Sequence, residues 1–133
     1  MKRDLASNLF PAVSLDVAVF TSDQNGTGVD LAGYESAVAL FIFGASGDTL
    51  SGSVKVLPVL QESDDDGTYT DVAAADLVGA LTVVDDPAED SLVQKVGYIG
   101  SKRYLRTKFD FTGTHTNGIE CSGVVVRGTK RHN

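Results

Sequence analysis

The carboxylates around Gly67 are the side chains of this sequence that come nearest to a metal site. Alternating carboxylates beside a glycine can surround a calcium ion with about six to eight oxygens, and Asp64, Asp66 and Asp71 have that character. The match to an EF-hand loop is incomplete, because Ala73 stands where that loop has its bidentate glutamate. An Asp- and Gly-rich turn at the tip of a β-hairpin explains the same residues without a metal. We therefore expect an acidic turn and no metal, with calcium at the three aspartates as the alternative.

No combination of residues predicts a catalytic centre. A nucleophile needs a base within hydrogen-bond reach, and the two histidines, His115 in a turn and His132 in the penultimate position, are expected to be neither rigid nor enclosed. Cys121 lies in an alternating strand pattern, where a free cysteine acts as a small apolar core residue. Ser46 lacks the spacing of a nucleophile elbow. We expect no catalytic residues, and the protein is not expected to be an enzyme.

Sequence motifs for cofactors are absent as well. The chain has no Walker phosphate loop, no dinucleotide fingerprint and no histidine pair at zinc spacing, and no helical pattern follows its glycine-rich residues 25–28. The net charge of −7 argues against binding of nucleic acid. The longest apolar run, residues 38–43, is far short of the roughly 20 residues that cross a bilayer. We expect no cofactor, no nucleic acid and no membrane as partners, and one cysteine without an intrachain bridge indicates synthesis in the cytoplasm.

The elements that must position these residues are β-strands, because period-two alternation recurs almost throughout the chain and helical periodicity is nearly absent. Strand patterns cover residues 13–19, 37–43, 54–62, 68–72, 81–84, 92–96, 104–111 and 119–126. Residues 73–79 alone favour a helix, of about two turns. These patterns predict one all-β domain, an antiparallel β-sandwich or jelly roll with about eight strands, one short helix and extended termini.

Three segments support more specific predictions. In residues 13–19 the odd positions are all valine or leucine, so these positions are expected to face the core. Residues 37–43 are apolar throughout, which is typical of a central strand covered on both faces. The dipeptide at residues 117–118 is Asn-Gly, which favours a tight hairpin turn.

The ends of the chain differ in composition from its middle. We expect an N-terminal arm over residues 1–12, a β-sandwich domain over residues 13–128 and a basic C-terminal tail over residues 129–133. Arms of this kind are often loose in a monomer and become ordered against neighbours in an assembly.

Charge is distributed unevenly along the chain. Residues 1–100 carry 4 basic and 16 acidic side chains, whereas residues 101–133 carry 7 basic and 2 acidic side chains. The basic side chains of one strand region are predicted to bind a partner, and they are Lys102, Arg103, Arg106 and Lys108. The other interpretation is that the acidic and basic halves lie side by side and cancel locally.

Tyrosines offer a different kind of binding surface. Tyr34, Tyr69 and Tyr98 could form aromatic platforms for a sugar, as in carbohydrate-binding modules. The absence of tryptophan makes this a minor alternative.

Four segments resemble small virion proteins of tailed bacteriophages and of prophages of alphaproteobacteria, of the head decoration or head spike type. The segments are Asp23-Gln-Asn-Gly-Thr-Gly-Val-Asp-Leu31, Gly33-Tyr-Glu-Ser-Ala37, Gln61-Glu-Ser-Asp64 with Gly67-Thr-Tyr69, and Gly97-Tyr-Ile-Gly-Ser-Lys-Arg-Tyr-Leu-Arg106. The resemblance implies a β-rich piece of the phage head or its attachments, without an assigned reaction and without catalytic residues.

The expected function is that of a capsid decoration (cement) protein in the virion. Such a protein would oligomerise and bind the outer face of the major capsid protein shell, through residues 1–12 and the four basic side chains. The alternatives are a structural component of the head–tail junction or tail, and a carbohydrate-binding module for attachment to the host surface.

Overall fold

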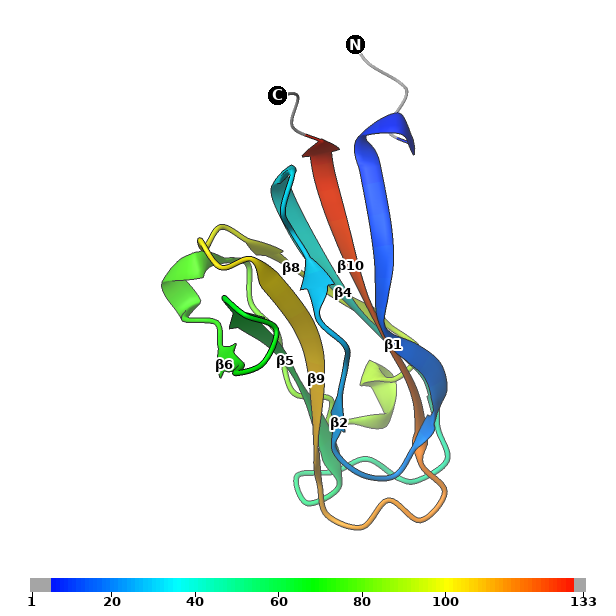
Figure 1. The fold of residues 1–133 in the computed structure, drawn as a ribbon. Coiled ribbons are helices and arrows are strands. Elements are labelled where there is room, and N and C mark those ends of the chain that lie inside the picture. The colour runs from blue at the N-terminus through cyan, green and yellow to red at the C-terminus, as the bar shows by residue number, and fades with distance from the viewer. Residues whose placement is uncertain (1–5, 131–133) are drawn as a thin grey trace.

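The computed structural model describes residues 6–130, which form two antiparallel β-sheets packed face to face (Figure 1). Sheet A has the strand order β1-β10-β4-β8-β7, and sheet B has the order β2-β9-β5-β6, with β3 also pairing with β9. The strands of sheet A are β1 (Leu9–Phe20), β4 (Tyr34–Ser46), β7 (Leu77–Val78), β8 (Val93–Tyr98) and β10 (Ile119–Lys130). Those of sheet B are β2 (Gln24–Asn25), β3 (Val29–Asp30), β5 (Lys55–Ser63), β6 (Thr70–Asp71) and β9 (Tyr104–Thr112). The all-β sandwich is confirmed, with ten described strands where about eight were expected.

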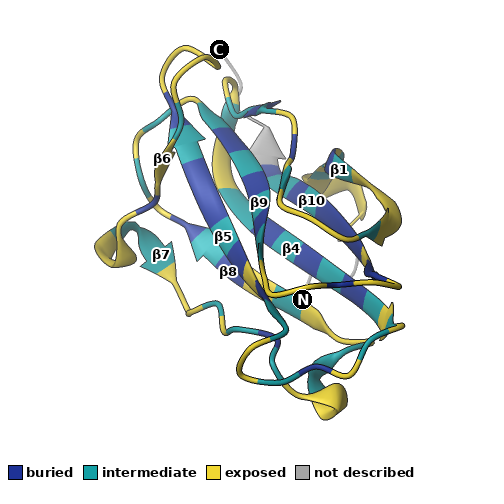
Figure 2. Ribbon diagram, turned by 90° about the horizontal axis from the view of Figure 1, so that it is seen from below, coloured by how far each residue is buried: buried dark blue, intermediate teal, exposed yellow. Residues whose placement is uncertain are grey.

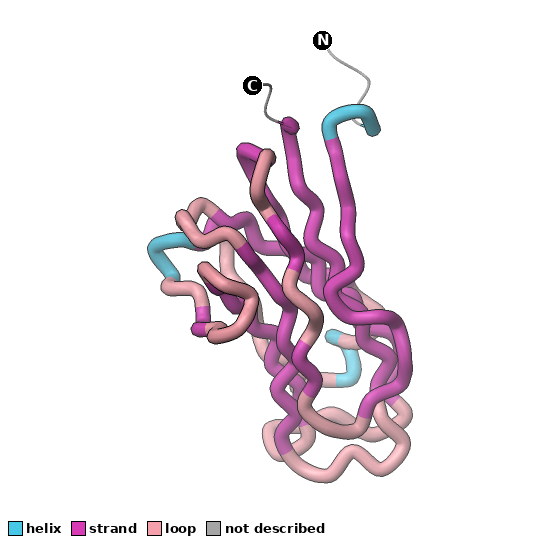
Figure 3. Tube along the Cα trace, viewed as in Figure 1, coloured by secondary structure: helices cyan, strands magenta, loops and turns pink. Residues whose placement is uncertain are grey.

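Helical structure in residues 6–130 is limited to three single turns of 3-10 helix, at η1 (Ala6–Asn8), η2 (Ala74–Asp76) and η3 (Pro87–Glu89) (Figure 3). The helix of about two turns expected at residues 73–79 is reduced to η2. Its second half instead forms β7, because Leu77 and Val78 find ladder partners on β8 in Tyr98 and Gly97. No helix in the described part of the chain is long and apolar enough to cross a lipid bilayer.

The core between the sheets is organised around Phe109 of β9. Its ring contacts Phe41 and Phe43 of β4 edge to face, with both pairs of ring centroids 5.5 Å apart, an arrangement that aromatic quadrupoles favour. The three side chains are almost completely buried. This contact joins sheet A to sheet B.

Strand β4 is central in sheet A, as its apolar run predicted, but it is not covered on both faces. Its buried positions Ala39, Phe41 and Phe43 alternate with half-exposed positions Leu40 and Ile42 (Figure 2). Only one sheet packs against β4, so only every second side chain can reach the core.

The expected orientation of β1 is wrong for most of its length. Ser14 is buried, whereas Val13, Val17 and Val19 are exposed. The strand is irregular on both sides of Leu15, and its inward Ser14 Oγ accepts the N–H of Thr107 (3.0 Å) and donates to the carbonyl of Thr27 (2.9 Å). A serine therefore ties the edge of sheet A to sheet B, and the valines remain outside.

Both expected terminal segments overlap regular structure. Residues 9–12, assigned to the N-terminal arm, belong to β1 and pair with β10 from Leu9↔Gly128 onward. Strand β10 in turn runs through residues 129–130 of the expected tail. Pairing with a long partner strand thus supplies the stability that the composition of residues 1–12 does not suggest. The remaining parts of both expectations, residues 1–5 and 131–133, lie outside the described residues.

The Asn-Gly turn at residues 117–118 does not form a hairpin, because the strands on either side of it belong to different sheets. Gly118 adopts a left-handed conformation with φ of +83°. The carboxylate of Asp48 accepts the N–H groups of Gly118 (2.8 Å) and Asn117 (3.1 Å), and these hydrogen bonds lower the pKa of Asp48. The turn is thereby held against the loop that follows β4.

We predict that Phe109→Ala lowers the free energy of unfolding by about 3–5 kcal/mol, because it removes a buried ring and leaves a cavity between the sheets. Ile99→Ala is the control, since Ile99 is 65% exposed, and we expect it to cost less than about 0.5 kcal/mol. Urea unfolding followed by circular dichroism measures both. Equal losses in the two variants would contradict the role of Phe109.

Candidate functional site

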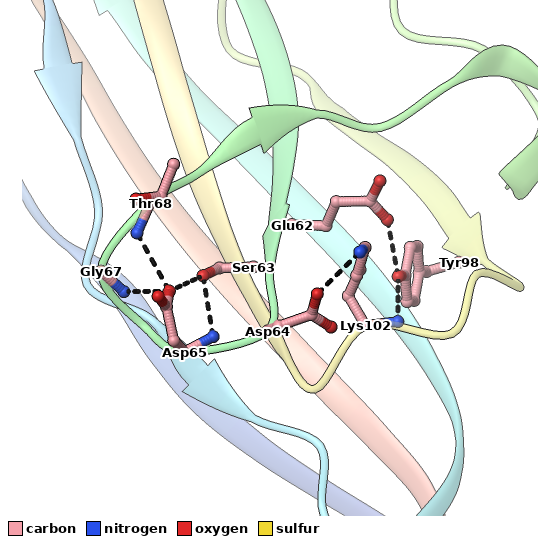
Figure 4. A network of polar contacts seen from close by, with 8 residues as sticks. All are labelled: Glu62, Ser63, Asp64, Asp65, Gly67, Thr68, Tyr98 and Lys102. Carbon is pink, nitrogen blue, oxygen red and sulfur yellow. Dashed lines mark hydrogen bonds and ion pairs between the residues drawn. The ribbon is translucent and has the colours of Figure 1, made fainter.

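Segments from distant parts of the sequence meet at one end of the sandwich, and we call this region the rim (residues 28–37, 61–71 and 98–106). It contains most of the residues that carry the resemblance to virion proteins. Hydrogen bonds and ion pairs between the segments hold the rim together, and Figure 4 shows part of this network. Antiparallel pairing of β5 with β9, and of β3 with β9, brings the segments to the same end.

Tyr98 lies at the centre of the network. Its hydroxyl donates to Glu62 (2.7 Å) and accepts the backbone N–H of Lys102 (2.9 Å) (Figure 4). The side chain is buried, and burial together with the Glu62 hydrogen bond raises the pKa of Tyr98. Because the phenol stays protonated, it keeps both hydrogen bonds and holds the β8–β9 loop to β5.

Two basic residues of the predicted partner-binding set pair with aspartates from earlier segments. Lys102 Nζ lies 2.8 Å from the carboxylate of Asp64. Arg103 donates two hydrogen bonds to the carboxylate of Asp30, at 2.9 and 2.8 Å. The bidentate guanidinium pairing, aided by the backbone N–H of Ala32, lowers the pKa of Asp30 to about 2. Acidic and basic halves of the chain therefore cancel locally at these two pairs.

The other two basic residues also have partners within the chain. Arg106 donates to the side-chain oxygen of Gln61 (2.8 Å), and its guanidinium lies 4.1 Å from the centre of the Tyr69 ring. Lys108 Nζ lies 3.4 Å from the Oδ1 atom of Asp110. Lys102, Arg103, Arg106 and Lys108 line one strand and the loop before it, and their binding to a partner stays a prediction.

The acidic turn is organised by Asp65. The carboxylate of this residue accepts the N–H groups of Gly67 (2.9 Å) and Thr68 (3.1 Å) and the hydroxyl of Ser63 (2.9 Å) (Figure 4). The hydrogen bonds from the turn lower the pKa of Asp65. Turn chemistry thus explains why an aspartate stands at this position.

The three calcium candidates engage separate groups. Asp64 pairs with Lys102, Asp66 accepts the Tyr69 hydroxyl, and Asp71 accepts the side-chain amide of Gln61 at 2.8 Å. Within residues 6–130 no group of three or more His, Cys, Asp or Glu side chains is arranged to hold a metal ion. The fold therefore does not assemble the predicted alternative site.

The tyrosines do not form a flat platform. Tyr98 is only 5% exposed. A guanidinium covers one face of each of the other rings, from Arg106 on Tyr69 and from Arg127 on Tyr34 (4.5 Å). The geometry that a sugar ring needs for stacking is not assembled by these three residues.

A cavity of about 420 Å³ opens beside the network. It is lined by residues 31–37 and 98–103, from the turn before β4 and the loop between β8 and β9. Both apolar side chains, such as Leu31 and Ile99, and the charged Glu35 and Arg103 contribute to its wall. The cavity therefore offers both apolar contacts and charged groups to whatever binds there.

Two residues outside the rim that could take part in catalysis, His115 and Cys121, are both buried. His115 is 4% exposed, so the expectation of an open position is wrong; its Nε2 lies 3.0 Å from the Thr112 carbonyl and its ring packs on Phe111. Cys121 is buried as expected, and burial raises the pKa of its thiol to about 12. His132 lies outside the described residues.

Sequence reasoning missed the acidic partners of the rim. Asp30 and Glu62 lie within the segments of the resemblance, but their partners are distant in the chain, whereas the partners of Asp65 are within three residues. Only Asp65 had a local signal, since an aspartate two residues before a glycine often caps a turn.

Comparisons with protein-family models and with curated proteins found no match for this sequence.

We predict that Asp30→Asn lowers the free energy of unfolding at pH 6 by about 0.5–1 kcal/mol, a modest value because the pair is partly exposed to water. Since the folded pKa of Asp30 is lowered to about 2, the unfolded chain binds more protons between pH 4 and pH 2. The stabilisation is therefore present above about pH 4 and is lost as the pH falls to about 2. The difference between wild type and variant, measured by urea unfolding, should shrink over that range.

A double-mutant cycle with Arg103→Gln is the control for this pair. The two single variants and the double variant should lose about the same stability, because each breaks the same interaction. A difference between wild type and Asp30→Asn that is as large at pH 2 as at pH 6 would show that the ion pair is not its cause.

Proposed function

We propose that this chain is a structural protein of a bacteriophage particle, a capsid decoration protein that oligomerises, binds the outer face of the major capsid protein shell and stabilises it. The observation that carries the proposal is the convergence of the segments behind the virion resemblance into one rim with a cavity. Segments that are far apart in the sequence and share one surface are expected to share one task. In this proposal the task is attachment to the shell formed by the major capsid protein.

The construction of the rim supports binding better than catalysis. Two of its carboxylates pair with basic side chains, and its central tyrosine is held by two hydrogen bonds. These contacts hold the loops beside the cavity to the neighbouring strands. A rigid surface loses little conformational freedom when it binds, which suits a protein that stabilises a shell through many repeated contacts.

Local pairing of charge also affects how the rim would recognise the lattice. Because the four basic residues have partners within the chain, shape and hydrogen bonding would contribute more than long-range attraction. The contribution of these four side chains to binding should therefore depend weakly on salt. The cavity between residues 31–37 and 98–103 would receive a loop of the major capsid protein.

Particles of the phage or prophage that encodes the chain provide the test, after deletion of its gene. We predict that they assemble but lose resistance to heat and low salt, and that added wild-type protein restores it. The double variant Lys102→Ala, Arg103→Ala should bind such particles at least about tenfold more weakly, because it opens two pairs that shape the rim. Co-sedimentation with particles measures binding.

Lys55→Ala is the matched control, since Lys55 is also a basic residue on sheet B but lies at the opposite end of β5 from the rim. It should bind like the wild type. Circular dichroism establishes that each variant is folded. Particles formed after deletion of the gene that keep normal heat resistance but lack DNA or tails would overturn the decoration role. They would favour a role at the head–tail junction.

A further inference from the structure

The outer faces of the two sheets differ in character. On sheet B, the outward side chains of β9 are Tyr104, Arg106, Lys108 and Asp110, as expected for a face in water. On sheet A, the outward rows are almost entirely apolar. A surface that is solvated in the finished assembly does not need such a row of valines and leucines.

The ladder registers define the apolar face of sheet A. One row crosses the strands through Pro11, Val126, Val38, Gly97 and Val78; the next through Val13, Val124, Leu40 and Lys95; the third through Ser122, Ile42 and Val93. Three of these side chains are more than half exposed, Val13 at 54%, Val78 at 59% and Val93 at 59%, and the central positions of β4 and β10 are of intermediate exposure. We call these three rows the apolar face.

We propose that a second copy of this chain covers the apolar face, so that two sandwiches pack sheet A against sheet A. This adds an interface to the proposed function, on a surface separate from the rim, and it would stand if the particle role failed.

Pairing of β1 edges is the competing mode of self-association, and the strand is built against it. Among the described strands β1 pairs only with β10, and on its other side the carbonyl of Ser14 accepts the backbone N–H of Thr27 at 2.6 Å. The strand also contains Pro11, which has no N–H, and irregularities on both sides of Leu15. Proline and bulges are the usual protection of an edge strand. The edge is therefore protected, whereas the face beside it is not.

The size of the face fits a reversible dimer. The three rows hold twelve positions, and each outward position of a sheet covers roughly 33 Å², so the face measures roughly 400 Å². Two such faces bury roughly 800 Å² in total, less than the roughly 1,200 Å² of a standard stable interface. We therefore expect a weak dimer that forms reversibly in the upper micromolar range.

Charge on the face is also self-complementary. At outward positions 36–44 of β4, 93–97 of β8 and 120–128 of β10, the charged side chains are Lys95 and Glu120. Neither takes part in an ion pair among the described residues. Lys95 lies in the row of Leu40, and Glu120 lies beside Gly44, so that Ile42 is midway between them.

A two-fold axis in the plane of the face that passes near Ile42 would place each lysine on the partner's glutamate. A symmetric dimer requires such isologous pairing, in which Lys95 of each copy meets Glu120 of the other copy. The strands of the two copies would then cross at a steep angle, as in orthogonal sheet packing. A surface of the shell would need its own acidic and basic residues at matching positions, whereas a second copy provides them by symmetry.

Sedimentation velocity of the purified full chain, from about 1 to about 100 µM, tests the proposal. We expect a dimer whose dissociation constant rises at least about tenfold in Val93→Lys and in Val13→Lys, because each buries an unpaired charge. Both side chains are more than half exposed in the single chain, so the variants should fold. Leu57→Lys is the matched control, since Leu57 is a 40% exposed leucine on the outer face of sheet B, and it should leave the dimer unchanged.

Charge reversal tests the pairing. Lys95→Glu and Glu120→Lys should each weaken the dimer, and the double reversal should restore it to within about threefold of wild type. A monomer at all concentrations, or equal weakening by Leu57→Lys, would overturn the proposal. A monomer whose Val93→Lys variant no longer binds particles would also overturn it, and would assign the face to the shell.

Discussion

The edge-to-face packing of Phe109 against Phe41 and Phe43 determines the orientation of most side chains in sheet A. Successive side chains of a strand point to opposite faces, so once Phe41 and Phe43 face the core, Leu40 and Ile42 must face outward. The ladder then passes this orientation to β10 and β8 through direct partners. The apolar face is thus a consequence of the same contact that closes the core.

Local pattern predicted the elements well where a strand is long and regular. Alternation located β5, β8, β9 and β10, and a continuous apolar run located β4. It failed where partners decide the outcome. Strands β2 and β3 have two residues each and exist through pairing with β9. The inward turn of Ser14 depends on hydrogen bonds to Thr27 and Thr107, which no local rule supplies.

The candidate site was predictable in position more than in chemistry. The segments of the resemblance marked the rim, and the basic residues were identified correctly as a group on one strand region. Their acidic partners were not evident, because Asp30 and Asp64 come from segments 73 and 38 residues away from Arg103 and Lys102. Charge polarity along the chain therefore becomes local pairing in the fold, and it does not leave a strongly basic surface.

A dimer through the apolar face would carry two rims, since the three rows share no residue with the rim (residues 28–37, 61–71 and 98–106). Attachment of one rim to a lattice raises the effective concentration of the other near the next site, so that two weak contacts can give stable binding. This matters because the basic side chains of the rim already have partners within the chain and gain little from long-range attraction. A modest interface between copies and a modest contact with a repeating shell would thus support each other, while the protected edge of β1 keeps association from extending beyond the pair.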